Sequence, residues 1–384
     1  MIATLAIGLL ALSCKPDEPV IPDPDPDPIP QKTPQEQLAS MSLREKIGQL
    51  FIVRPEALEY SVDWTNTSMT SYQLMSITDS MRETWREYPV GGLIIYAHNI
   101  ANPYQLTTFT RSIHDLGMLV CIDEEGGSVA RIGRNKNFNV KTYSSMGDIG
   151  ATGDPKNAYE CGNTIGRYLK EYGVDINFAP VADVNTNPQN IVIGKRAFSD
   201  DPAVAAPMVT NYLQGLKDAG IVGCIKHFPG HGDTTADTHY GYAQSLKTWE
   251  QMLACEMITF IEGIKWGAQL IMTAHIAAPN VTGSDVPSTM SPVILQDKLR
   301  KELGYKNIII TDSMEMGAIT REYTPAESAV GCIKAGADIF LGTMNLKECF
   351  DALVSAVQKS DIPESRIDES VLRVLELKQQ VKQL

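Results

Sequence analysis

Residues 220 to 239 of the chain read GIVGCIKHFPGHGDTTADTH. The first six residues, Gly220 to Ile225, form an apolar run of the length of a buried strand. One lysine, three histidines and two aspartates follow within fourteen residues, and the glycines and the proline between them exclude a regular helix. Packing alone does not need so many ionisable groups, so the stretch predicts a shaped loop that carries chemistry at the end of a strand.

Short apolar or β-branched runs of this kind recur along the chain, and amphipathic segments of helix length separate them. Strands that alternate with helices indicate a parallel sheet, and eight such units predict a closed (β/α)8 TIM barrel, an α/β fold, here as a single domain over residues 35–384. The expected strands are 50–53, 91–96, 118–123, 176–180, 220–227, 269–275, 307–312 and 337–342. The expected helices include 158–172, 203–219, 248–267, 325–336 and a closing helix at 367–378.

Ionisable residues stand where four of these strands end. They are Asp123, the pair Lys226 and His227, His275, and Asp312. Active residues of such barrels lie at the carboxyl ends of the strands. A single aspartate there is easily explained as a helix cap, but four strand ends with such residues are not.

The motif Lys226 to Gly232, followed after four residues by Asp237-Thr238-His239, resembles the signature of the single-domain β-N-acetylhexosaminidase branch of glycoside hydrolase family 3. The resemblance implies a retaining, exo-acting enzyme that releases terminal β-linked N-acetylglucosamine from muropeptide, chitin-type or glycan fragments. Asp312 matches the nucleophile position and His239 the proton donor. Asp237 would accept a hydrogen bond from this imidazole and orient it, as the carboxylate of a catalytic triad does.

Five residues match the sugar-binding positions of the family: Asp123, Arg131, Arg196, Lys226 and His227. Paired cations and carboxylates of this kind can grip vicinal hydroxyl groups by charge-assisted hydrogen bonds. Three more, Asp183, His231 and His275, are expected to support these groups. At Ser128 the chain departs from the family, which usually carries a basic residue there.

Other readings of the same residues remain open. His227, His231, Asp237 and His239 could ligate zinc, but Pro229 and Gly230 keep the first two off a shared helical face, so no metal or other cofactor is expected. A histidine donor would not repel phosphate, so a phosphorylase is an alternative, as is a β-glucosidase. A non-catalytic sugar-binding barrel is the alternative from another class, although it would not need both Asp312 and His239.

Residues 1–14 resemble a lipoprotein signal peptide that ends at Cys14, although no Lys or Arg precedes its apolar run. Residues 15–34 are rich in proline and aspartate and predict an extended, solvated linker. We therefore expect a lipid-anchored enzyme of a bacterial envelope, in the periplasm or on the outer membrane, or else a periplasmic or secreted one. The net charge of −13 argues against a nucleic-acid partner. The six other cysteines are scattered, as is typical of buried small apolar residues.

Overall fold

The protein is described here by a computed structural model that covers residues 32–59, 73–234 and 243–384. The predicted signal peptide with Cys14, nearly all of the predicted linker, and the segment with Asp237 and His239 lie outside the described residues. Predictions that concern them are therefore not tested by the structure.

Eight parallel strands form one sheet in the order β7-β6-β5-β4-β3-β2-β1-β8. A parallel bridge between Ile310 and Ile339 joins the two outer strands, so the sheet closes on itself. The predicted (β/α)8 barrel is confirmed, with strands shorter than expected. They are β1 (Phe51–Val53), β2 (Gly92–Ile95), β3 (Leu119–Ile122), β4 (Ile176–Asn177), β5 (Val222–Phe228), β6 (Leu270–Thr273), β7 (Ile308–Thr311) and β8 (Phe340–Leu341).

Alternation along the strands divides the buried residues into two layers. In β1, Ile52 packs inside the barrel, whereas Phe51 and Val53 pack outward against the helices. Val374 and Leu377 of the last helix, α14 (Glu364–Gln383), join the inner layer. The helix α14 therefore packs against one end of the barrel interior.

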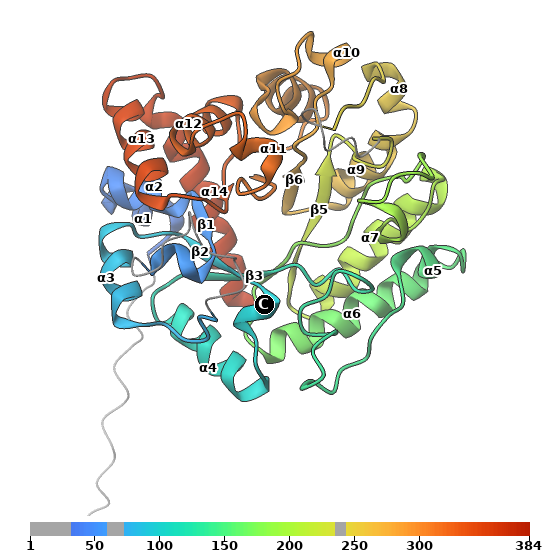
Figure 1. The fold of residues 1–384 in the computed structure, drawn as a ribbon, viewed down its shortest axis with the longest axis horizontal. Helices are drawn as coiled ribbons and strands as arrows, with labels where there is room; N and C mark the ends of the chain where they lie inside the picture. Colours follow the sequence, from blue (N-terminus) through green and yellow to red (C-terminus); the bar gives the residue numbers. More distant parts are fainter. Residues whose placement is uncertain (1–31, 60–72, 235–242) are drawn as a thin grey trace, which may run out of the picture.

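Helices surround the strands (Figure 1). The remaining α-helices are α1 (Pro34–Ser40), α2 (Leu43–Gln49), α3 (Asp79–Glu87), α4 (Pro103–His114), α5 (Met146–Gly150), α6 (Pro155–Glu171), α7 (Pro202–Asp218), α8 (Trp249–Leu253), α9 (Glu256–Trp266), α10 (Pro279–Thr282), α11 (Gly317–Thr320), α12 (Pro325–Ala335) and α13 (Leu346–Gln358). The short helices η1 (Pro55–Leu58), η2 (Ala97–Asn99), η3 (Gly194–Arg196), η4 (Ser288–Met290) and the π-type η5 (Val293–Glu302) lie between them.

The prediction of a single helix at 248–267 is wrong, because the structure has two helices there. Cys255, with φ −141° and ψ −83°, interrupts it, so that α8 ends at Leu253 and α9 begins at Glu256. At the start of α9, the buried Glu256 carboxylate forms an ion pair with the Lys247 ammonium.

The cysteines follow the prediction: the six in the described part of the chain are free thiols, and all but Cys255 are buried. None of the helices in that part has the length and apolar character needed to cross a membrane.

Candidate active site

Lys226 is the centre of a charged network at the carboxyl ends of the strands. It lies within β5, where its carbonyl accepts a hydrogen bond from the Ala182 amide at 2.6 Å, so the sheet itself positions the residue. Its side chain is buried, and Nζ contacts Asp123 Oδ1 at 2.8 Å and Glu125 Oε1 at 2.6 Å. Burial lowers the pKa of this ammonium, but the two carboxylates outweigh burial and raise it. Lys226 is therefore a permanent cation.

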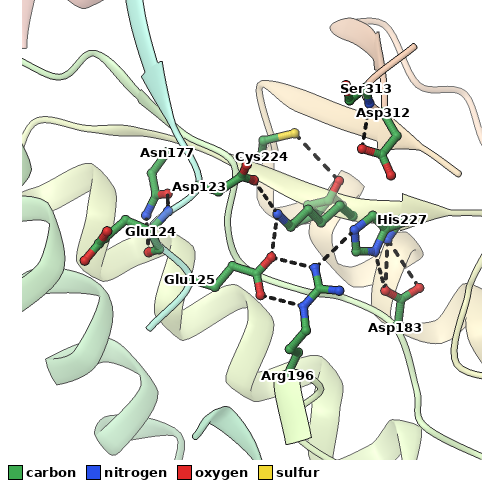
Figure 2. A network of polar contacts seen from close by, with 12 residues as sticks. Asp123, Glu124, Glu125, Asn177, Asp183, Arg196, Cys224, His227, Asp312 and Ser313 are labelled. Carbon is green, nitrogen blue, oxygen red and sulfur yellow. Dashed lines mark hydrogen bonds and ion pairs between the residues drawn. The ribbon is translucent and has the colours of Figure 1, made fainter. Parts of the chain in front are cut away.

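Glu125 links Lys226 to Arg196, and the sequence analysis did not select it. Arg196 holds this carboxylate with two hydrogen bonds, from Nε at 2.9 Å and from Nη2 at 2.7 Å (Figure 2). Burial acts to raise the pKa of Glu125, yet Lys226 and Arg196 hold it at about 2. The doubled glutamate after β3 was the available signal, but partners 71 and 101 residues away are invisible to local sequence.

Asp123 and Arg131 approach each other because the intervening loop is fixed by Glu124. The buried Glu124 carboxylate accepts hydrogen bonds from the amides of residues 131–133, and from the Tyr168 hydroxyl at 2.8 Å. Arg131 Nη2 then lies 3.3 Å from Asp123 Oδ2. Both side chains remain partly exposed, at 26% for Arg131 and 18% for Asp123, so they can still meet a ligand.

The buried Asp183 orients His227, which follows Lys226 in β5. Asp183 Oδ2 lies 2.7 Å from His227 Nδ1, which fixes the imidazole and directs Nε2 toward Arg196 Nη2 at 3.4 Å (Figure 2). The His231 amide also donates to Asp183, at 2.6 Å. Burial acts to raise the pKa of Asp183, but the neighbouring His227 and His231 lower it. Asp183 thus holds both the His227 imidazole and the His231 backbone in place.

Steric packing requires a glycine at position 232, shortly before the segment that the structure does not describe. A Cβ atom on Gly232 would come within 1.9 Å of the Val184 carbonyl oxygen, so the loop after β5 can pack on the loop after β4 only with glycine there. The two ends of that segment are also tied together: Ser245 Oγ donates to Asp233 Oδ2 at 3.3 Å, and Lys247 Nζ lies 3.4 Å from Asp233 Oδ1.

Asp312 follows β7 directly and does not cap a helix, because the next helix, α11, has Met316 at its N-cap. Its carboxylate is half-buried and accepts one hydrogen bond, from the Ser313 amide at 2.7 Å. Among the residues that the structure describes, no second donor lies within hydrogen-bond distance. His275 Nε2 lies 2.9 Å from the Ser313 carbonyl, so it supports the backbone beside Asp312. Burial lowers the pKa of His275, although Asp312 opposes this shift.

A second cluster at the same end of the barrel was also missed. Arg54, directly after β1, forms an ion pair with Glu315, three residues after Asp312. The guanidinium groups of Arg54 and Arg131 lie over the Tyr96 ring at 5.3 and 5.7 Å from its centroid. Burial raises the pKa of Glu315 despite the opposing effect of Arg54. Residues after β1, β2 and β7 are therefore in contact at the mouth of the barrel, which only the closed fold brings about.

The structure thus joins seven predicted residues in one connected network: Asp123, Arg131, Arg196, Lys226, His227, Asp183 and His231. Asp312 and His275 lie at the neighbouring strand ends, and Figure 2 shows Asp312 beyond the His227 ring. Within residues 32–59, 73–234 and 243–384, no group of three or more His, Cys, Asp or Glu side chains is placed to hold a metal ion.

A TIM barrel carries its active site at the carboxyl ends of its strands, and here these ends present a lone carboxylate beside paired cations and carboxylates. Residues 42–377 match the model of the glycosyl hydrolase family 3 N terminal domain. The chain belongs to glycoside hydrolase family 3, and the recognition made from its sequence is confirmed.

Two beta-hexosaminidases and one solved structure are among the proteins similar to this chain. It is 31% identical over 345 residues to beta-hexosaminidase A of Pseudoalteromonas piscicida, covering 81% of this chain and 56% of the relative. It is 30% identical to a beta-hexosaminidase of Stenotrophomonas maltophilia, covering 73% of this chain and 84% of the relative. A family 3 β-N-acetylglucosaminidase from a Paenibacillus species superposes with a TM-score of 0.81 at 34% identity, covering 89% of this chain and 63% of that one. The chain thus spans little more than half of the first relative.

Proposed function

We propose that the protein is a retaining, exo-acting β-N-acetylhexosaminidase that releases terminal β-linked N-acetylglucosamine. Relatives at 30–34% identity bear the names beta-hexosaminidase and β-N-acetylglucosaminidase. The observation that carries the proposal is the position of Asp312: a carboxylate at a strand end, with one hydrogen bond and no helix to cap, beside the Lys226 network.

In the first step, a carboxylate oxygen of Asp312 attacks the anomeric carbon and the bond to the leaving oxygen breaks. A glycosyl ester on Asp312 forms, and the leaving oxygen takes a proton. We assign this proton to His239, with Asp237 as the partner that orients the imidazole. Both assignments rest on the Asp237-Thr238-His239 sequence, since these residues lie outside the described part of the chain.

In the second step, water attacks the anomeric carbon and the ester bond to Asp312 breaks. The water proton passes to His239, which restores the acid for the next cycle. Two inversions at the anomeric carbon give net retention. A histidine suits both roles because its ordinary pKa lies near neutrality.

The Lys226 network fits the binding of the sugar hydroxyl groups. Asp123 offers a partly exposed carboxylate, and the Arg131 guanidinium beside it offers donors. Because Lys226 and Arg196 are held by Glu125, these groups are arranged before substrate arrives. A substrate hydroxyl therefore replaces water without a large reorganisation of charges.

A panel of aryl glycosides tests this function. We expect the N-acetylglucosaminide to be cleaved far better than the glucoside, with the β-anomer as the first product seen by proton NMR. A preference for the glucoside would support a β-glucosidase. Added phosphate separates the remaining alternative, because release of sugar 1-phosphate would identify a phosphorylase.

The location of the enzyme is a further part of the proposal. Lipid attachment at Cys14 would tether the barrel to an envelope membrane through residues 15–34. Fragments of peptidoglycan or chitin-type oligosaccharides are then the substrates within reach. Cys14→Ser should move the enzyme from the membrane fraction to the soluble fraction of the producing cell. Membrane association that survives this change would exclude the lipid anchor.

A further inference from the structure

A cavity of about 740 Å³ lies at the amino ends of the strands, opposite the candidate active site. Its walls include residues that precede β1 to β4, such as Gln49, Val90, Met118 and Asp175, together with residues of α14. Sites that bind small organic molecules commonly have volumes of about 300 to 1,000 Å³. The cavity is therefore of a size to hold such a molecule.

The charges that line the cavity are mostly positive. Four lysines border it: Lys32, Lys170, Lys378 and Lys382. The carboxylate in the lining belongs to Asp175, which already accepts hydrogen bonds from His114 Nε2 at 2.9 Å and from the Val120 amide at 2.8 Å. In a chain of net charge −13, this concentration of cations is opposite to the charge of the molecule as a whole.

Lys378 is the cation placed deepest in this wall. It is half-buried on α14, and Nζ donates to Gln49 Oε1 at 2.7 Å and to the Gly117 carbonyl at 2.9 Å. Both acceptors are neutral, and in the described ranges no carboxylate oxygen lies within 4 Å of any of the four ammonium groups. Burial lowers the pKa of Lys378 to about 8, and the positive charge of Lys382 adds to the shift. A bound anion would offset this cost of burying an unpaired charge.

The rest of the lining is apolar to a large extent. Met41, Trp85, Leu116 and Val381 line the cavity as half-buried side chains and supply hydrocarbon and aromatic surface. The Trp85 indole N–H already donates to the Val90 carbonyl at 3.3 Å. The lining therefore combines an apolar surface with a group of cations. We propose that this cavity is a second binding site, for an organic anion with an apolar body, such as a medium-chain carboxylate. The proposal does not depend on the chemistry at the other end of the barrel.

The fluorescent sulfonate 8-anilinonaphthalene-1-sulfonate is a suitable probe, because it combines an anionic group with aromatic rings. Titration of the full-length protein should give saturable binding to one site. Lys378→Met should weaken binding about tenfold, which corresponds to loss of one charge-assisted contact. Lys334→Gln, a change at an exposed lysine of α12 outside the cavity, is the matched control and should bind the probe as the unmodified protein does. Equal binding by Lys378→Met and the control would overturn the proposal.

The double variant Lys170→Gln/Lys382→Gln changes two exposed residues and keeps the test valid if Lys378→Met does not fold. It should also weaken probe binding, and unchanged binding would count against the site. Decanoate should displace the probe much better than decanol, which has the same chain length without the charge. Equal displacement by both would show that no anion is required and would overturn the assignment.

The acidic sequence before Lys32 is the alternative ligand that a further variant tests. If the full-length chain binds the probe more tightly once Asp23, Asp25 and Asp27 are all changed to Asn, the cavity belongs to that segment and the proposal is wrong. Unchanged affinity in this triple variant supports a separate ligand. Cleavage of an aryl N-acetylglucosaminide should be the same in all these variants, since none alters the strand ends that carry Asp312.

Discussion

Two charged networks lie at opposite ends of the barrel, and they differ in how completely their groups are paired. At the amino end, the Asp338 carboxylate is fully buried and contacts Arg300, Arg366 and Arg373, the Ser370 hydroxyl and the Ile309 amide. At the carboxyl end, Asp123 is 18% exposed although Lys226 and Arg131 hold it. The first network ties α14 to β7 and β8. The second keeps polar groups directed to solvent, as a site for a hydroxyl-rich ligand needs.

This contrast shows that burial of charge does not by itself mark a functional site. Both networks hold buried ion pairs, whose net contribution to stability is small or unfavourable when compared with apolar packing. The difference is that the Asp338 carboxylate is fully buried among its partners, whereas Asp123 and Arg131 keep part of their surface open to solvent, where we propose that the substrate binds. Substitutions at the two ends should therefore affect different properties.

Removal of the proposed nucleophile, Asp312, should give the largest effect on catalysis. Asp312→Asn should lower kcat/KM by about three orders of magnitude or more on every glycoside, because no glycosyl ester can form. The free energy of unfolding should change little, since one hydrogen bond to the Ser313 amide holds this side chain. Steady-state kinetics and urea unfolding measure the two quantities. Retention of more than a tenth of the activity would rule out Asp312 as the nucleophile.

Loss of the proposed acid should depend on the leaving group. His239→Ala should slow cleavage of natural sugars about 10²- to 10⁴-fold, the usual contribution of general acid–base catalysis. An aryl glycoside with an acidic phenol should be affected much less in the first step, because its phenolate leaves without a proton. Asp237→Ala should behave as a weaker version of the same change.

The comparison needs pre-steady-state rates on good and poor leaving groups. Equal damage to both, without a burst that would reveal a slow second step, speaks against His239 as the acid.

Removal of Lys226 should impair both function and stability. Lys226→Met leaves Asp123 and Glu125 without their shared cation, so it should destabilise the fold by about 3–5 kcal/mol and raise KM strongly. Arg300→Met is the matched change at the other end, because Asp338 keeps two arginines there. It should cost less stability and leave KM unchanged. An increase in KM of similar size in both variants would contradict the proposal that only the Lys226 network binds substrate.

Neutralising the Asp338 carboxylate should change the stability of the protein and leave its activity unchanged. Asp338→Asn leaves three guanidinium groups without a carboxylate and should lower the free energy of unfolding by about 3 kcal/mol, because solvent partly screens the arginines. The kcat of the folded enzyme should stay within twofold of its original value. Chemical denaturation and active-site titration on the same sample separate these effects, and a large fall in kcat per folded site would contradict the assignment of a structural role.

Acid should weaken the Lys226 network in a defined pH range, because Glu125 becomes protonated there. The pKa of Glu125 is about 2 in the fold against an ordinary value of 4.5, so its contribution is fully present above the ordinary value and is lost as pH falls toward 2. The contribution amounts to at most about 3 kcal/mol. Glu125→Gln should therefore be less stable at neutral pH and should show a flatter dependence of unfolding free energy on pH between about 5 and 2. An unchanged slope would show that Glu125 is not held by Lys226 and Arg196 in solution.

The fold could be predicted from the sequence because each strand is a short apolar run that ends in a turn or a polar residue. All eight strands were found within a few residues of their ends, since burial on both faces makes such strands stand out. The break at Cys255 was not visible, because the sequence across it keeps the pattern of one amphipathic helix. The start of α9 is held by long-range contacts, such as the hydrogen bond from the Thr259 hydroxyl to the Ala182 carbonyl, and the local sequence does not indicate these.

The site was predictable where residues stand at strand ends, and not where they reach across the barrel. Asp123, Lys226, His227 and Asp312 are at positions that the barrel defines. Glu125 takes its role from Arg196, and Glu315 takes its role from Arg54, 261 residues earlier. Such pairs follow from closure of the sheet, so no local pattern indicates them.

The hydrogen bonds of Glu124 also limit how the length of the loop after β3 can change. Surface loops usually accept insertions and deletions. Here the Glu124 carboxylate binds the amides of residues 131–133, so the chain between them closes a ring of fixed length beside Asp123. One added or removed residue would shift Arg131 away from its partner. In this chain the ring should therefore tolerate an exchange of residue type, such as one at Ser128, better than a change of length.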